Sequence, residues 1–361
     1  MPEIHAERHA GRRERLAALV AERDADAALI TQLVNVRYLT GLASSNAALL
    51  VGADGTAVLC TDGRYAGMAA TVCPELELIV NRRTAATLTA RAVERGARRL
   101  AFEAHAMTVE AHGELAADAP ELVPLGRAVE ELRRVKDEAE IALLREACAI
   151  TDRAFAEVHP MIAPGVTERE IGIALERRMV DLGAERPAFE SIVASGPNGA
   201  IPHHRPADRV IEAGDLVTLD FGALHGGYHA DMTRTVAVGR VADWQREIYE
   251  LVARAQRAGT AAAVPGAETQ VVDAAARDII AAAGHKDDFP HGLGHGVGLE
   301  IHESPLLGYD KTGKLVDRVP ITTEPGVYLA GRGGVRIEDT LVVRAGGPEL
   351  LTTTTKELLV L

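Results

Sequence analysis

Apolar residues recur at two spacings along the first part of the chain, and these spacings predict its helices and strands. Helical spacing indicates helices at residues 12–23, 84–95 and 108–117. Short apolar runs predict strands, with a turn at Asp54-Gly55 joining two of them: AALIT, NAALLVGA, TAVLCT, LELIV and RLAFE. We therefore expect residues 1–130 to form a small α/β domain.

The pattern changes after residue 126. Residues 131–162 predict one long amphipathic helix that ends before Pro164-Gly165, and residues 167–182 predict a second. Strand-like runs follow, then helices at 243–262 and 268–283, then strands again. Because the order helix, helix, strands occurs twice, we expect residues 131–361 to form a second domain of two similar halves around one mixed sheet. The predicted fold class is α+β.

Two aspartates lie on strands that a hairpin would bring together. Alternation in DLVTLDFG puts Asp220 on the same face as Thr218, and in YHADMTRT Asp231 shares a face with Thr233. A hairpin would present both carboxylates side by side, where they repel each other unless a cation lies between them. The alternative is a pair of exposed acids beside a hairpin loop.

Two glutamates and a histidine complete a candidate metal site. Glu338 interrupts the apolar strand pattern of GVRIEDT, Glu324 precedes Pro325-Gly326, and His295 lies in the glycine-rich run HGLGHGVGLEIHE. Carboxylates with one imidazole suit Mn²⁺, with Co²⁺ or Zn²⁺ as alternatives. If the five side chains converge, the set predicts two divalent ions and hydrolytic chemistry.

The glycine-rich region does not predict a nucleotide site. GLGHGVG breaks the dinucleotide-binding pattern, and Leu315 stands where a phosphate loop needs Ser or Thr. His291, His295 and His302 fall within this region. Three histidines near acids indicate a ligand together with acid–base or oxyanion-binding groups.

Composition narrows the class of protein further. The chain has 361 residues, 47% of them hydrophobic, and a net charge of −13. This charge argues against nucleic-acid binding, and Arg12, Arg13 and Arg15 are expected on a solvated helix face. No signal peptide or membrane span is expected. Three cysteines without metal or redox spacing favour the reducing cytoplasm.

Taken together, the motifs resemble those of the creatinase/aminopeptidase P/prolidase family, which has the pita-bread fold. The resemblance rests, in order, on GPNGAIPHH, LVTLDFG, YHADMTRT, GLGHGVGLEIHE, TTEPGVYL and GGVRIEDT. YLTGL, SNAALLV and TDGRY resemble the N-terminal domain of the same family. The resemblance therefore covers both halves of the chain.

The resemblance implies roles for individual residues. The ligands of two metal ions would be Asp220, Asp231, His295, Glu324 and Glu338. Asp231 and Glu338 would bridge both ions, and Glu324 would handle the proton of a metal-bridging hydroxide that acts as the nucleophile.

Other polar side chains would bind substrate. His203 and His302 would bind the scissile carbonyl or the developing oxyanion. His291 would form part of the wall of the proline pocket, and Arg336 would orient a ligand carboxylate. The remaining nearby histidines are expected to be non-ligands: His204, His225 and His229.

The resemblance implies a homodimeric peptidase that cleaves the bond before proline in peptides and releases the N-terminal residue. Relatives restricted to dipeptides often carry an arginine just after H-E-x-P, where this chain has Leu306, with Lys311 or Lys314 as the nearest substitute. We therefore expect an aminopeptidase P-like enzyme, with prolidase as the alternative. A metal-free C–N hydrolase or a scaffold of this family would have lost metal ligands, and a non-peptidase hydrolase or lyase would use the same ions.

Overall fold

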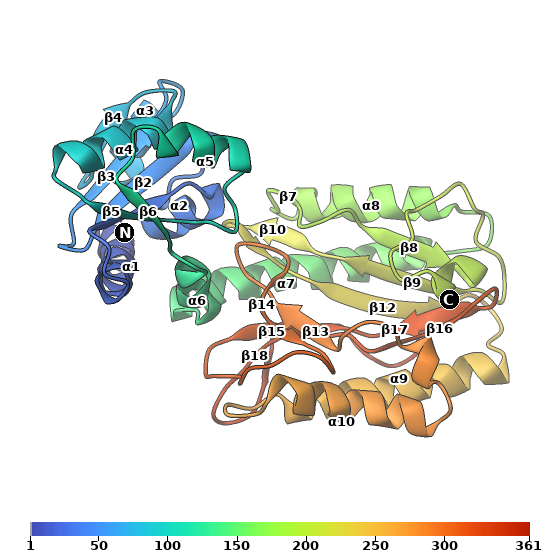
Figure 1. The fold of residues 1–361 in the computed structure, drawn as a ribbon. Helices are drawn as coiled ribbons and strands as arrows, with labels where there is room; N and C mark the ends of the chain where they lie inside the picture. The colour runs from blue at the N-terminus through green and yellow to red at the C-terminus, as the bar shows by residue number, and fades with distance from the viewer. Residues whose placement is uncertain (1) are drawn as a thin grey trace. The chain divides into compact units, whose positions relative to one another are not determined.

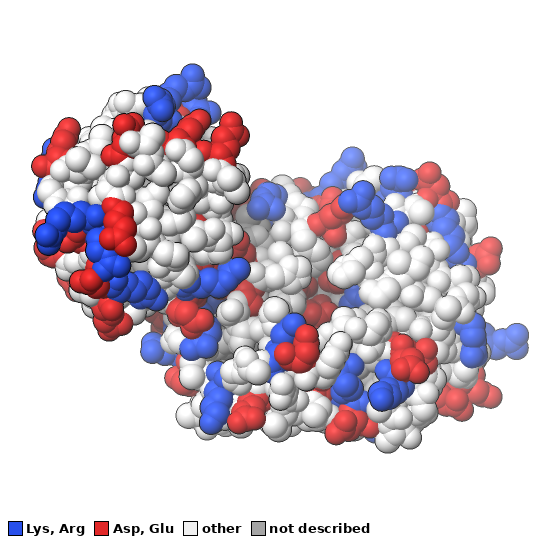
Figure 2. Space-filling model, in the orientation of Figure 1, with Lys and Arg blue, Asp and Glu red and all other residues white. Residues whose placement is uncertain are grey.

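The computed structural model describes residues 2–361, with side chains from residue 7 onward. Its contacts divide the chain into one unit that ends at Arg133 and another from Arg134 to Leu361. No helix in this described part of the chain is long and apolar enough to cross a membrane. On the face that Figure 2 shows, basic and acidic side chains alternate, so that face carries no extended basic surface.

The first unit is built on a six-stranded sheet in the order β4-β3-β2-β1-β5-β6. Strand β2 is antiparallel to both β1 and β3, and the other pairs are parallel. The strands are β1 (Ala27–Ile30), β2 (Ala47–Gly52), β3 (Ala57–Thr61), β4 (Glu77–Val80), β5 (Arg99–Phe102) and β6 (Glu121–Pro124). The helices are α1 (Pro2–Glu22), α2 (Leu33–Thr40), α3 (Ala66–Val72), α4 (Thr84–Glu94), α5 (Val109–Ala116) and α6 (Ala128–Arg134).

The predicted solvated face of helix α1 is wrong for two of its three arginines. Arg12 and Arg13 are only 2% and 6% exposed, whereas Arg15 is exposed. Arg12 donates to the carbonyl of Tyr38 at 3.0 Å, and Arg13 donates to that of Leu39 at 2.9 Å. These carbonyls belong to the last turn of α2 and have no partner within a helix, so guanidinium groups at this end stabilise it.

The second unit repeats one order of elements twice, as the sequence predicts. The first half contains α7 (Glu138–Val158), α8 (Glu168–Asp181), β7 (Arg186–Pro187), β8 (Ile192–Ser195), β9 (Leu216–Phe221), β10 (Ala223–His225), β11 (Tyr228–His229) and β12 (Met232–Ala237). The second half contains α9 (Asp243–Ala262), α10 (Thr269–Ala282), β13 (Gly294–Gly296), β14 (Glu303–Leu307), β15 (Pro320–Thr323), β16 (Gly326–Leu329), β17 (Gly333–Arg336), β18 (Asp339–Val342) and β19 (Glu349–Leu350).

Each helix pair of the second unit covers its own group of strands (Figure 1). One apolar core contains Phe155, Leu175 and Leu219, from α7, α8 and β9. Another contains Val252, Ile280 and Ile321, from α9, α10 and β15. The α+β class is confirmed, and the strands between the two cores are where the candidate ligands lie.

The single long helix predicted for residues 131–162 is wrong. Helix α6 ends at Arg134 and α7 begins at Glu138. Asp137 caps α7 by accepting from the backbone N–H of Glu140, whose side chain accepts from the N–H of Asp137 in return. This capping box starts a new helix within a continuous amphipathic pattern. Helix α7 then ends at Val158, two residues before Pro160.

The expectation of one mixed sheet in the second unit is also wrong. Its strands pair into four antiparallel sheets. The breaks coincide with candidate ligands: Glu324 lies between β15 and β16, Glu338 lies between β17 and β18, and the register shifts after His295. A break in a strand lets a side chain leave the alternating pattern and turn toward the site.

Candidate metal centre

Strand pairing brings Asp220 and Asp231 together at one edge of the site. Asp220 on β9 pairs with Thr233 on β12, and Asp231 lies two residues before Thr233 on the same face. The two carboxylates are therefore diagonal neighbours, as the alternation predicted. The connection between the strands is not a simple turn, because residues 223–229 form the short hairpin β10–β11.

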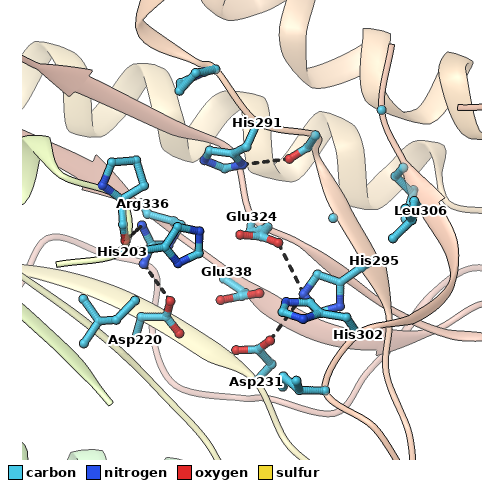
Figure 3. A pocket seen from close by; sticks show the side chains of 18 of the residues that line it. His203, Asp220, Asp231, His291, His295, His302, Leu306, Glu324, Arg336 and Glu338 are labelled. Carbon is cyan, nitrogen blue, oxygen red and sulfur yellow. Dashed lines mark hydrogen bonds and ion pairs between the residues drawn. The ribbon is translucent and has the colours of Figure 1, made fainter. Parts of the chain in front are cut away.

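His295, Glu324 and Glu338 reach the same place from the other half of the unit (Figure 3). His295 Nε2 lies 3.5 Å from an oxygen of Asp231 and 3.5 Å from an oxygen of Glu324. Asp231, His295 and Glu338 each offer a ligand atom, and these atoms lie within 4.8 Å of one another. All five predicted side chains line one cavity of about 660 Å³.

The carboxylates of this cluster are buried and repel one another. Burial raises the pKa of Glu324 to about 8, and the charge of Asp220 adds to the shift. Burial also raises the pKa of Asp231 and of Glu338 well above their ordinary values, with neighbouring carboxylates as the next cause. A cation is the ordinary means of keeping such groups ionised together.

Two carboxylate oxygens in the cluster have no partner among the described residues. They are Oδ1 of Asp220 and Oε1 of Glu338, while the second oxygen of Glu338 accepts from Thr233 at 2.7 Å. A buried polar atom without a partner costs about 1–3 kcal/mol. The orphaned oxygens thus fit a site that holds divalent cations.

The ring of His295 is oriented as a metal ligand. Its Nδ1 lies 3.0 Å from the carbonyl oxygen of Gly296, which can only accept, so Nδ1 donates. Burial lowers the pKa of His295 to about 4, which keeps the ring neutral. The lone pair of Nε2 therefore faces the oxygens of Asp231 and Glu324, an arrangement that is repulsive until a cation lies between them.

Arg336 is a buried guanidinium at the edge of the cluster. It donates to Asp220 at 2.6 Å, to the hydroxyl of Tyr328 at 2.9 Å and to Thr233 at 3.1 Å. One guanidinium cannot neutralise four carboxylates. Arg336 therefore orients Asp220 and leaves the rest of the negative charge uncompensated.

His291 has both ring nitrogens engaged within the protein. Its Nδ1 donates to the carbonyl of Gly292 at 2.8 Å, and its Nε2 lies 2.8 Å from the hydroxyl of Tyr328. Burial lowers the pKa of His291 to about 4, so the ring is neutral and Nε2 accepts. His291 consequently has no free N–H for a substrate and presents only its ring to the cavity.

His203 and His302 are exposed and line the cavity on either side of the carboxylates (Figure 3). The ring of His302 packs edge-on against that of His295, with centroids 4.4 Å apart. Partial burial and then the charge of His203 lower the pKa of His302. These two rings are the histidines placed to meet a molecule in the cavity.

The three histidines expected to be non-ligands each contact another group. His204 Nε2 lies 2.7 Å from a carboxylate oxygen of Glu168. His225 contacts the carbonyl of Gly183, and His229 contacts that of Gly298.

Sequence patterns did not identify several polar residues that support the site. Tyr328 joins Arg336 to His291, and Thr233 contacts both Arg336 and Glu338. The pair Asp273–Arg277 on α10 holds the backbone of Leu293 and His291. For Thr233 the signal was available, because it shares a strand face with Asp231; the others depend on long-range contacts.

Comparison with known proteins agrees with this geometry. Residues 142–345 match the model of metallopeptidase family M24, and residues 12–135 match that of the creatinase/prolidase N-terminal domain. The chain belongs to metallopeptidase family M24. It is therefore a hydrolase of the peptidase class, and its family is one that uses divalent metal ions.

Similar proteins span the whole chain. An uncharacterized peptidase, YqhT, of Bacillus subtilis is 42% identical over 96% of this chain and 99% of its own. A solved Xaa-Pro dipeptidase from Bacillus anthracis is 37% identical, with a TM-score of 0.95 over 98% of this chain and 100% of its own. A solved X-Pro aminopeptidase from Thermotoga maritima is 34% identical, with a TM-score of 0.89 over 97% and 99%.

Proposed function

We propose that this chain is a metal-dependent Xaa-Pro peptidase of the aminopeptidase P type. It would hydrolyse the bond before proline and release the N-terminal residue. The observation that carries the proposal is the meeting of four carboxylates and His295 in one cavity, with three further histidines on its walls. The preference for proline is supported by the names of the similar solved enzymes.

The ions of this site would be held by the five converging side chains. We propose two divalent ions, manganese by preference, with Asp231 and Glu338 shared between them. When bound, such ions polarise a carbonyl and make water a stronger nucleophile at neutral pH. The orphaned oxygens of Asp220 and Glu338 support this occupancy.

The chain's own residues would then move protons and stabilise charge. A carboxylate oxygen of Glu324 would take the proton of the attacking water and return it to the leaving nitrogen. His203 and His302, whose rings line the cavity, would donate to the substrate carbonyl oxygen as its negative charge develops. One such donor contributes about 3 kcal/mol to barrier reduction.

The wall near Leu306 supports acceptance of peptides longer than two residues. Leu306 lines the cavity and is 46% exposed, so this position offers no positive charge to a dipeptide carboxylate. Lys311 also lines the cavity, but it pairs with Asp310 at 2.9 Å. Lys314 is absent from the described cavity lining.

Prolidase remains the second candidate, because a similar solved structure is named Xaa-Pro dipeptidase. Turnover of Xaa-Pro, Xaa-Pro-Yaa and Xaa-Ala-Yaa by the manganese-loaded protein tests both proposals. Faster cleavage of Xaa-Pro-Yaa than of Xaa-Pro supports the aminopeptidase P type. Cleavage of dipeptides alone supports prolidase, and equal cleavage of Xaa-Ala-Yaa contradicts the proline preference.

A metal-free or scaffold role has a separate test. Elemental analysis of the purified protein, followed by assays with added manganese, cobalt or zinc, distinguishes it from a metallopeptidase. Protein that binds none of these ions and gains no activity would contradict the metal-dependent mechanism.

We also propose that the chain forms a homodimer and acts in the cytoplasm. The dimer is what the family resemblance implies, and sedimentation of the purified protein at micromolar concentration tests it. The location is favoured by three buried cysteines, all of them free thiols. A fusion to a fluorescent protein would report the compartment directly.

A further inference from the structure

The segment that carries His203 has little regular structure of its own. Residues 195–207, here called the His203 segment, contain one short 3₁₀ helix (Gly196–Ala200) and otherwise run without helix or strand. Such a backbone needs outside partners to hold a side chain in one place. The partners of this segment therefore decide where His203 lies in the cavity.

Most of the segment's anchors converge on the carboxylate of Glu168. This side chain is 0% exposed. One oxygen accepts from the N–H of Ser195 at 2.7 Å, from its hydroxyl at 2.7 Å and from Asn198 at 2.9 Å. The other accepts from His204 Nε2 at 2.7 Å and from the N–H of Ala207 at 3.1 Å. One carboxylate thus ties down both ends and the middle of the His203 segment.

The bonds to Glu168 are of the strong, charge-assisted kind. Burial alone would raise the pKa of Glu168, but the hydrogen bonds from Ser195 and Asn198 outweigh it and the pKa lies below its ordinary value. The carboxylate is therefore ionised, and charge-assisted bonds are roughly twice as strong as neutral ones.

Glu168 is not needed to start helix α8. It is the first residue of that helix, but the helix is already capped by Thr167 and Glu170, which exchange hydrogen bonds in a capping box. Glu170 uses its carboxylate on the helix end, whereas Glu168 uses its carboxylate on the His203 segment. These two acids of one helical turn therefore differ in role and can be compared directly.

The far side of the His203 segment lies against the metal centre. The carbonyl of Pro202 accepts from Arg336 at 3.3 Å, and the same guanidinium holds Asp220. At Gly334 on β17, an added Cβ would lie 2.3 Å from the carbonyl oxygen of Gly199, so the backbones touch. A shift of the segment would consequently displace His203 relative to the ligands.

We propose that Glu168 is a positioning residue that fixes the His203 segment and so places the His203 ring at the substrate carbonyl. The inference rests on the proposed function, because it assumes that His203 contacts the reacting group. It assigns to Glu168 no contact with substrate or metal of its own.

The variant Glu168→Gln tests this role, with Glu170→Gln as the matched control. Whichever way the new amide turns, its NH₂ faces a backbone N–H, that of Ser195 or of Ala207, and cannot accept from it. A displacement of about 1 Å at a reacting group costs on the order of 100-fold in rate, so kcat for Xaa-Pro-Yaa should fall about 10- to 100-fold in Glu168→Gln. KM should change much less, and Glu170→Gln should keep the parent kcat.

A double-mutant cycle separates positioning from general destabilisation. If Glu168 acts through His203, adding Glu168→Gln to His203→Ala should lower kcat by less than about twofold. Additive losses in kcat would overturn the proposal. Should Glu168→Gln fail to fold, Asn198→Ala removes a single bond to Glu168 and takes its place in the same cycle, with a smaller loss of kcat expected from it alone.

Hydrogen exchange gives a readout that needs no substrate. Peptides covering residues 195–207 should exchange faster in Glu168→Gln than in Glu170→Gln, while peptides from β9 and β12 keep their protection. Unchanged exchange in this segment would contradict the positioning role even if activity falls. Conversely, if the parent protein cleaves no proline peptide or His203→Ala keeps full kcat, the proposed function fails and exchange alone decides the role of Glu168.

Discussion

Arg336 Nη2 lies 2.6 Å from Oδ2 of Asp220, and both side chains are nearly buried. This pair fixes one oxygen of Asp220 and leaves the other without a partner, facing the carboxylate cluster. The same guanidinium contacts Tyr328, whose hydroxyl reaches His291. A continuous chain of hydrogen bonds therefore joins a candidate metal ligand to a wall of the substrate cavity.

Replacing Arg336 should weaken metal binding. Arg336→Met leaves Asp220 without its orienting partner, and loss of such a partner typically costs about 10- to 100-fold in metal affinity or activity. Titration of the metal-free protein with manganese, followed by calorimetry, measures the change in Kd. Arg332→Met is the control, because Arg332 stacks on Trp244 and does not line the cavity. An unchanged Kd in Arg336→Met would contradict the orienting role.

The metal-free protein should lose stability as pH rises from about 6.5 to 8. Glu324 has a folded-state pKa of about 8, well above that of the unfolded chain, so folding holds a proton that the unfolded chain has released. This contribution is complete only below the unfolded pKa, and it disappears as pH rises through the folded pKa. The slope is at most about 1.4 kcal/mol per pH unit for each such carboxyl.

The pH window and the metal dependence make this prediction specific. Above pH 6.5 the buried histidines are neutral in both states, so they do not oppose the trend. Urea unfolding with EDTA at pH 6.5, 7.25 and 8 should give a falling free energy of unfolding. Added manganese should remove the fall, and a flat profile in EDTA would argue against a repulsive carboxylate cluster.

A positive charge at position 306 should shift the preference toward dipeptides. Leu306→Arg places a guanidinium on the cavity wall, and a hydrogen bond to a charged group contributes about 1.5 kcal/mol or more. The ratio of kcat/KM for Xaa-Pro to that for Xaa-Pro-Yaa should rise about tenfold. Leu306→Met controls for the change of shape. A ratio that rises equally in both variants would mean that charge is not the cause.

Arg12 and Arg15 offer a matched pair for the first unit. Arg12→Leu removes the hydrogen bond to the carbonyl of Tyr38 and the stacking on its ring, and should lower the free energy of unfolding by about 2 kcal/mol. Arg15→Leu, at an exposed position, should change it by less than about 0.5 kcal/mol. Chemical unfolding of both variants measures the difference. Equal effects would contradict the buried capping role of Arg12.

Local patterns in the sequence determined the elements and the chemistry of this protein. Alternation alone put Asp220 and Asp231 on neighbouring faces, because side chains of a strand point to opposite sides in turn. Helical spacing found α9 and α10 close to their observed bounds. The break between α6 and α7 was missed, because a capping box can begin a new helix without interrupting the amphipathic pattern.

Only the tertiary structure decided which polar side chains support the site. Glu168 has the sequence context of an ordinary acid in the first turn of a helix, yet it binds groups 27 to 39 residues away. Arg12 has the context of a solvated face, yet it reaches carbonyls of another helix. Hydrogen bonds between distant segments depend on how elements pack in space, and no local spacing of residue types records that packing.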